Sequence, residues 1–301
     1  MKHLSSAFEG DNRPGQYVAT LLLSVVGLML LGGLPLLAAM LAHGVVSEEG
    51  LVETFSTNTY LLLMFSSFAI ALPVLWLCIR VFHHRNFRSV VNGGRPLRWG
   101  HFFTAFGLYT IVVALFQFLL VWLDADNYVW QFNSRAFFGM LPVLLVCVPV
   151  QTLFEEYLFR GYLMQATAFW TRRVWIALLL PALLFGLAHS ANPEVGAYGF
   201  CIMMVQYILF GLIFGWFTLA DDGIEVSWGM HTANNLFLLL FFTADHSALQ
   251  TPAVWKQLDA APTWKDPLEM LLVGALLWFV LKRIYRWKRP ALITKLNENN
   301  Q

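Results

Sequence analysis

The feature that most limits how this chain can fold is a series of long stretches that contain no charged residue. A helix needs about 20 mainly apolar residues to cross the hydrocarbon core of a membrane. Seven charge-free stretches are long enough, and they span residues 14–47, 54–79, 99–123, 136–154, 174–193, 195–220 and 226–244. An eighth, at 268–287, carries Lys282 and Arg283 close to its end, where long basic side chains can reach the membrane surface. The sequence therefore predicts an all-α, polytopic membrane helix bundle of about eight transmembrane helices.

Composition excludes several other classes of protein. Only 12% of the 301 residues are charged and 58% are hydrophobic, whereas soluble globular domains carry about 25% charged residues. A soluble enzyme, a disordered chain and a nucleic-acid-binding protein with a basic face are all excluded. The expected surroundings are the lipid bilayer, and no nucleic-acid partner is expected.

Basic residues mark alternate loops between the apolar stretches. Five arginines lie in the segment 80–98, Arg172 and Arg173 follow the fourth stretch, and a basic group begins at Lys282. Because cytoplasmic loops are enriched in Lys and Arg, this pattern predicts a multi-pass membrane protein with both termini in the cytoplasm. The membrane that we expect is the bacterial cell (inner) membrane. The loop 221–225 is an exception, since it is acidic where the scheme requires a cytoplasmic loop.

Charged residues inside a membrane span are costly and by default suggest function. The fourth stretch continues into FEEYLFR, which places Glu155, Glu156 and Arg160 in otherwise apolar surroundings. Glu156 and Arg160 are four residues apart and share a helix face, so an ion pair would lower the cost of burying both. Glu155 is rotated by about 100° from Glu156 and faces something else. The alternative is a purely structural Glu–Arg pair.

Two further polar motifs lie in later stretches. His189 ends the sequence FGLAH near the far end of the fifth stretch, and HTANN places His231 and Asn235 on one helix face in the seventh. Each motif alone has a structural explanation, because a buried histidine or a His–Asn pair can simply join helices by hydrogen bonds.

The spacing of the motifs suggests that they meet. Glu155 and His189 each lie 17 residues from Arg172 (172 − 155 = 189 − 172), so an antiparallel hairpin with its tip near Arg172 puts both about 25 Å from that tip. A carboxylate and an imidazole at one depth could bind and deprotonate a water molecule. His231 begins only a few residues into its stretch, so it reaches that depth only if the hairpin tip projects or the seventh span starts irregularly.

The three motifs, in this order, resemble those of the CPBP family of CAAX prenyl endopeptidases of the Rce type and bacteriocin-processing relatives, also called the Abi family. The resemblance covers roughly 148–242. It implies an intramembrane endopeptidase in which Glu155 and His189 activate water and His231 and Asn235 stabilise the oxyanion. Glu156 and Arg160 would position the site. The implied organisation is a scaffold of about three spans at 1–136, a CPBP-type catalytic core at 137–245, and a last span with a cytoplasmic tail at 246–301.

The resemblance leaves the role of a metal open, because family members are often labelled metalloproteases. A metal site could be drawn from Glu155, His189 and His231, with zinc as the ion. A neutral His–Asn pair one turn apart suits an oxyanion hole better than a metal shell, so we expect no obligatory cofactor.

Two other functions compete with proteolysis. One is a secondary transporter with a buried Glu/Arg/His proton relay, and the other is a non-catalytic scaffold of the same fold that binds a partner membrane protein. The expected partner of the enzyme is a membrane-associated peptide or protein substrate. The sequence identifies neither the substrate nor the oligomeric state.

Overall fold

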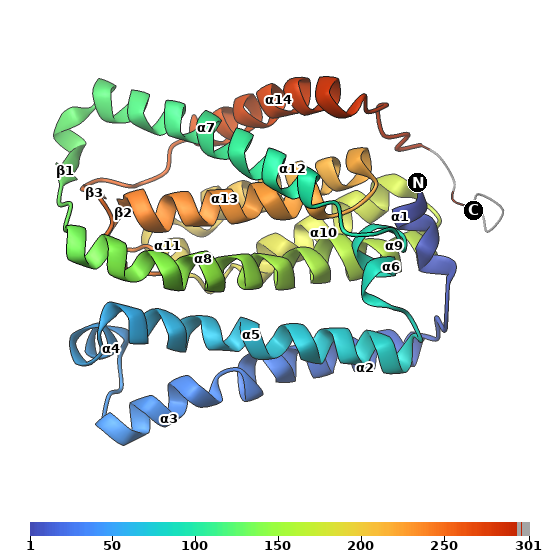
Figure 1. Cartoon of the computed structure of the whole chain (residues 1–301), viewed down its shortest axis with the longest axis horizontal. Helices are drawn as coiled ribbons and strands as arrows, with labels where there is room; N and C mark the ends of the chain where they lie inside the picture. Colours follow the sequence, from blue (N-terminus) through green and yellow to red (C-terminus); the bar gives the residue numbers. More distant parts are fainter. Residues whose placement is uncertain (294–295, 297–301) are drawn as a thin grey trace.

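The computed structural model describes residues 1–293 and 296. Long helices occupy the eight apolar stretches and run back and forth between two ends of the molecule (Figure 1). In chain order they are α2 (Pro14–Val25) joined through the π-helical turn η2 (Val26–Leu31) to α3 (Leu34–His43), then α5 (Thr57–Phe82), α7 (Trp99–Leu123), α8 (Ser134–Glu156), α10 (Val174–Ala188), α12 (Phe200–Asp221), α13 (Glu225–Phe241) and α14 (Asp266–Tyr285). Helix α8 continues through the π-helical turn η4 (Tyr157–Leu163) into α9 (Met164–Thr171). The predicted all-α membrane fold is confirmed, and in the described part of the chain five helices are long and apolar enough to cross a membrane.

Short elements occupy the connections. They are α1 (Lys2–Ser5), η1 (Ser6–Phe8), α4 (Glu48–Thr54), α6 (Phe87–Asn92), η3 (Ala125–Asn127) and α11 (Pro193–Tyr198). A small sheet, which the sequence did not predict, contains β1 (Tyr128–Trp130), β2 (Phe242–Thr243) and β3 (Trp255–Gln257) in the order β1-β3-β2. Strand β3 pairs antiparallel with β1 and parallel with β2. We call the end of the bundle that carries this sheet the sheet end, and the opposite end, with α1, α6 and the last turn of α14, the basic end (Figure 1).

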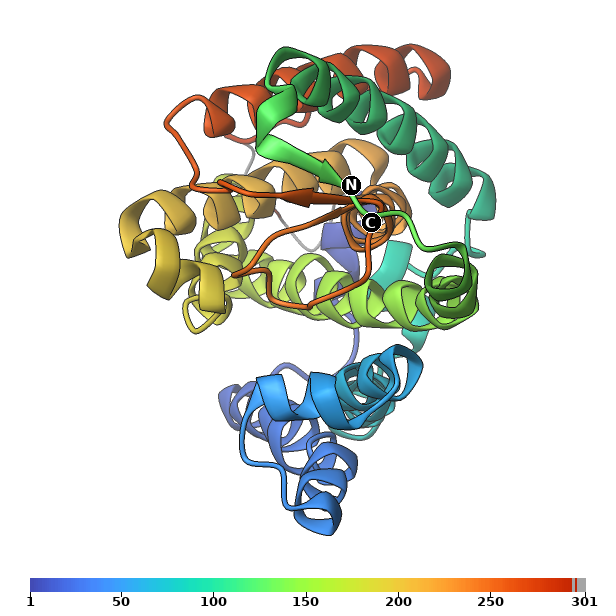
Figure 2. The ribbon, with the colours of Figure 1, turned by 90° about the vertical axis from the view of Figure 1, so that its left-hand side faces the viewer.

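The helices form layers around α8 and α13. Helices α2, α3 and α5 lie together on one side of α8, as a lobe that Figure 2 shows apart from the remaining helices. On the other side, α7 packs along α13 through a core that includes Tyr109, Val113, Met230 and Phe237. Helix α7 therefore packs with the helices that carry the polar motifs, although it precedes them by a long segment of the chain.

Ion pairs at the basic end account for the acidic loop that did not fit the charge pattern. The Arg98 guanidinium lies 2.5 Å from Glu225 and 2.8 Å from Asp221, and Arg95 lies 3.2 Å from Asp222. The His101 ring nitrogen Nδ1 is 2.8 Å from Asp221. Arginines of one basic loop thus neutralise the acids between α12 and α13, and this network ties the start of α7 to both helices.

The fifth and sixth stretches are interrupted where the sequence suggested longer helices. Helix α10 ends at Ala188, and Gly199, with φ of +105°, separates α11 from α12. Helices α10 and α12 then pack closely, because a Cβ added at Gly211 would lie 2.7 Å from the Ala182 Cα. Gly211 and Gly215, which form a GxxxG pattern, therefore serve packing within the chain.

Candidate active site

The central polar residues come from the junction between α8 and the π-helical turn η4. Glu155 and Glu156 end α8, and Arg160 lies in η4. Their exposed fractions are only 7%, 0% and 1%. Buried charges need partners in low-dielectric surroundings, so the contacts of these three side chains define the site.

Glu156, Arg160 and His231 form one connected group. Arg160 Nη1 donates to Glu156 Oε1 over 2.9 Å, which is the i,i+4 contact that the spacing predicted. His231 Nδ1 lies 2.9 Å from the same oxygen. The guanidinium also lies over the Phe185 ring, 4.2 Å from its centroid. Glu156 therefore orients the His231 imidazole and leaves Nε2 facing away from the ion pair.

Glu155 faces the other nitrogen of the same imidazole. Its Oε2 lies 3.5 Å from His231 Nε2, and this buried oxygen has no hydrogen-bond partner among the described residues. Its Oε1 accepts a hydrogen bond from the Gln151 side-chain amide. One carboxylate oxygen is thus held in place while the other is available for a water molecule or a substrate group.

Asn235 joins this group through Gln151. The Asn235 amide donates to Gln151 Oε1 over 3.0 Å. Asn234 donates to Asn235 Oδ1, and the Tyr109 hydroxyl of α7 donates to Asn234 Oδ1, each over 3.0 Å. Sequence analysis missed Gln151 and Tyr109, although Gln151 lies one helical turn before Glu155 in an apolar stretch, and that i,i+4 spacing was a usable signal.

The length of the helix that carries Glu155 explains how His231, near the start of α13, lies at the depth of Glu155. The helix from Ser134 to Thr171 is continuous over 38 residues, about 57 Å at 1.5 Å per residue, against a hydrocarbon core of about 30 Å. It therefore extends well beyond the core. Glu155 lies far enough along it to meet a residue in the second turn of α13.

His189 lies beside this group. It follows the last residue of α10, where its Nδ1 is 2.8 Å from the Phe185 carbonyl oxygen. Its ring stacks on Tyr207 with centroids 4.7 Å apart, and the Tyr207 hydroxyl donates to the Glu194 carboxylate. The Phe185 ring lies 4.4 Å from the His189 ring and 6.0 Å from the His231 ring. In the described part of the chain no hydrogen bond or ion pair links His189 to Glu155, so a water shared by these two residues stays a prediction.

The donor set does not match a protease-type zinc site, which usually has three protein ligands and an open position. Among residues 1–293 and 296, no three His, Cys, Asp or Glu side chains are grouped so that they could hold a metal ion. Of the three predicted candidates, Glu155 and His231 face each other, whereas His189 is turned toward Tyr207 and Phe185.

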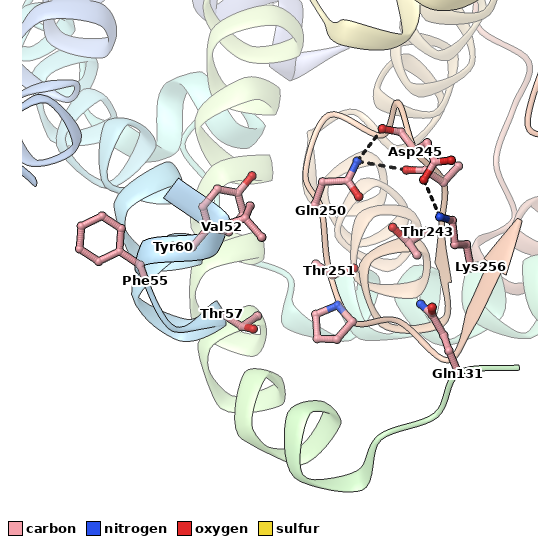
Figure 3. Close-up of a pocket in the computed structure, with 12 residues that line it drawn as sticks. Val52, Phe55, Thr57, Tyr60, Gln131, Thr243, Asp245, Gln250, Thr251 and Lys256 are labelled. Carbon is pink, nitrogen blue, oxygen red and sulfur yellow. Dashed lines mark hydrogen bonds and ion pairs between the residues drawn. The ribbon is translucent and has the colours of Figure 1, made fainter. Parts of the chain in front are cut away.

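Cavities between the described residues include one inside the bundle and one at its sheet end. The larger, about 540 Å³, lies between α7, α12, α13 and α14, and Tyr109, Phe214 and Asn234 line it. Phe214 separates it from His231, with ring centroids 5.2 Å apart, so this chamber adjoins the site. The smaller, about 360 Å³, is at the sheet end near the Asp245–Lys256 ion pair (Figure 3).

Comparisons with known proteins agree with these observations. The Type II CAAX prenyl endopeptidase Rce1-like family matches residues 135–237, which contain all three motifs. The uncharacterized protein YyaK of Bacillus subtilis (strain 168) is 31% identical over 287 residues, which cover 90% of this chain and 94% of that protein. No solved structure matches the chain. The chain therefore belongs to the Type II CAAX prenyl endopeptidase Rce1-like family of integral membrane proteases.

Proposed function

We propose that the chain is an intramembrane endopeptidase that hydrolyses peptide bonds in membrane-associated peptides or proteins. The observation that carries this proposal is the free Oε2 of a buried Glu155, placed 3.5 Å from His231 Nε2. A carboxylate whose other oxygen is held by Gln151 is oriented to accept a proton from a bound water. General-base catalysis of this kind typically contributes about 10²–10⁴-fold to a rate.

In the proposed reaction the water at Glu155 Oε2 attacks the scissile carbonyl carbon as its proton moves to Glu155. The resulting oxyanion accepts a hydrogen bond from the second amide hydrogen of Asn235, the first being held by Gln151. It accepts another from His231 Nε2–H when the ring is an imidazolium, because Nδ1–H of that ring already donates to Glu156. When the C–N bond breaks, the proton passes from Glu155 to the departing amine. His189 is a second candidate to bind this water, since its Nδ1 lies at the Phe185 carbonyl and its Nε2 makes no hydrogen bond among the described residues.

The Glu156–Arg160 pair has a different proposed role. Because Glu156 accepts from both Arg160 and His231, it fixes the imidazole ring much as the carboxylate of a hydrolase triad orients its histidine. No step in this scheme requires a metal ion, and we propose that the enzyme has no obligatory cofactor. The chamber beside Phe214 offers room for a segment of the substrate.

We further propose that the basic end faces the cytoplasm of a bacterial cell, with both termini on that side. The arginine-rich loop before α7 and the end of α14 lie at this end (Figure 1), which supports that orientation under the positive-inside rule.

The test is comparative peptidomics of membranes that contain the wild-type protein, Glu155→Gln or Glu53→Gln. Glu155→Gln is nearly isosteric and should abolish a defined set of cleavage products while the protein stays folded. Glu53→Gln is the matched control, because Glu53 is an exposed residue of α4, and it should give the wild-type products. Identical products from all three proteins would refute the proposal and favour a non-catalytic scaffold.

A further inference from the structure

The first residues of the chain are packed against the helix that carries the proposed site. His3, in α1, is 1% exposed. Its Nε2 lies 2.9 Å from the main-chain oxygen of Arg160. Arg160 is the residue that pairs with Glu156, so a side chain 157 residues earlier contacts the backbone of the site directly.

The contact lies within an unusual turn of the backbone. Residues 157–163 form a π-helical turn, a rare geometry in which one extra residue shifts the main-chain hydrogen bonds. Buried carbonyl groups at such a turn require donors, and an imidazole N–H is a suitable one. The His3 imidazole therefore supplies a donor to the main chain of this turn at Arg160, whose guanidinium pairs with Glu156.

Other contacts hold His3 in place from several sides. The Gln165 amide donates to the His3 carbonyl oxygen over 2.7 Å and lies 3.3 Å from His3 Nδ1. The backbone amides of Lys2 and His3 donate to the Asp222 carboxylate over 3.0 and 2.9 Å. A Cβ at Gly93 would lie 2.7 Å from the Lys2 carbonyl carbon, so the segment fits tightly against the end of α6. The hydrogen bonds and close packing around His3 therefore fix the position of its side chain.

The imidazole is in the protonation state that this arrangement needs. Burial lowers the pKa of His3 to about 4, so the ring is neutral at physiological pH. With the Gln165 amide near Nδ1, the single ring proton belongs on Nε2, where it is donated to Arg160. A neutral donor also adds no second positive charge near the Arg85 guanidinium, whose charge lowers the pKa of His3.

We propose that His3 is a positioning residue: through its hydrogen bond to the Arg160 carbonyl it holds the π-helical turn, and thereby the Glu156–Arg160–His231 group, in working geometry. The effect of His3 on catalysis rests on the proposed proteolysis, whereas its effect on the π-helical turn is independent of that function.

The test uses the full-length protein in detergent and compares three variants with the wild type. His3→Ala removes the donor, His3→Gln retains an N–H donor of similar reach, and Lys2→Ala alters an exposed side chain of the same helix as a control. Hydrogen exchange measured by mass spectrometry reports on peptides that cover 157–165. In His3→Ala these amides should exchange about tenfold faster, while amides of α7 and α14 keep their wild-type rates.

His3→Gln and Lys2→Ala should exchange like the wild type. With a cleavable peptide taken from the membrane peptidomics, His3→Ala should lower kcat with little change in KM, and His3→Gln should restore kcat. Unchanged exchange in 157–165, or faster exchange spread evenly over the molecule, would overturn the proposal. If the wild type yields no product, the proposed function fails, yet the exchange result still decides whether His3 holds the turn.

Discussion

Removal of the Glu156 carboxylate should destabilise the protein far more than removal of the neighbouring Glu155 carboxylate. Glu156→Gln leaves the Arg160 guanidinium, which is 1% exposed, without its counter-ion. Its remaining contacts are the Phe210 carbonyl oxygen at 3.5 Å and the aromatic ring faces. An uncompensated buried charge costs about 3–5 kcal/mol. At roughly 2–4 °C per kcal/mol, the melting temperature should fall by about 6–20 °C.

Glu155→Gln provides the matched comparison, since the chemical change is the same one residue away. Among the residues that the structure describes, Glu155 forms no ion pair with an arginine or lysine, and its 3.5 Å contact to His231 is long. Its loss should cost below about 1 kcal/mol. Thermal unfolding in detergent, followed by the fluorescence of the 12 tryptophans, measures both variants alongside activity.

A double-mutant cycle tests whether the ion pair itself causes the difference. Arg160→Met alone leaves the Glu156 carboxylate buried, whereas the double variant Glu156→Gln/Arg160→Met leaves neither charge. The double variant should therefore be about 2 kcal/mol more stable than the sum of the single losses implies. Additive losses, or equal melting temperatures for the two glutamate variants, would refute the division of roles between Glu155 and Glu156.

Three other predictions concern the metal, the topology and the pH dependence. Activity of the purified protein should survive prolonged treatment with a strong chelator. Loss of activity on chelation, followed by its recovery when a stoichiometric divalent ion is added, would instead identify His231 as a metal ligand. Single cysteines at the exposed positions Val46 and Arg88, in a variant without native cysteines, should react from opposite sides of the membrane with an impermeant thiol reagent; labelling from one side would contradict the topology. The pKa of His3 is about 6.5 in the unfolded chain and about 4 in the folded protein. As the pH falls, the His3 side chain of the unfolded state therefore takes up a proton before that of the folded state does. The free energy of unfolding should decline by up to about 3 kcal/mol from pH 6.5 to pH 4. Melting of His3→Gln should lack this component.

Sequence patterns predicted the features that depend on neighbouring residues. The apolar stretches placed the helices because a span is set by length and hydrophobicity. The four-residue spacing likewise placed Glu156 beside Arg160. The π-helical turn at 157–163 and the break at Gly199 were not predicted, since both depend on what packs against them. The contact of His231 with both glutamates depends on how far α13 is shifted along its axis relative to α8. A pattern within one helix does not contain this information.

Distant segments were the hardest to foresee. Tyr109 belongs to a helix that the sequence suggested was scaffold, yet it donates to Asn234. The three strands pair residues near 128, 242 and 256, and strands of two or three residues carry too little periodicity to predict. Such contacts arise only when the bundle is assembled, because they join elements that do not follow one another in the chain.

The shortness of α10 has a consequence for the surrounding lipid. Its 15 residues extend about 22 Å at 1.5 Å per residue, some 8 Å less than a hydrocarbon core of about 30 Å. Hydrophobic mismatch of this size is relieved by thinning of the adjacent bilayer, which brings headgroups and their water toward the end of the helix, where His189 lies. The hydrolysis that we propose needs water, and a thinned bilayer beside this short helix would be a route for it. Acyl-chain length should therefore control the rate, with lipids that form thick bilayers slowing the reaction in reconstituted vesicles.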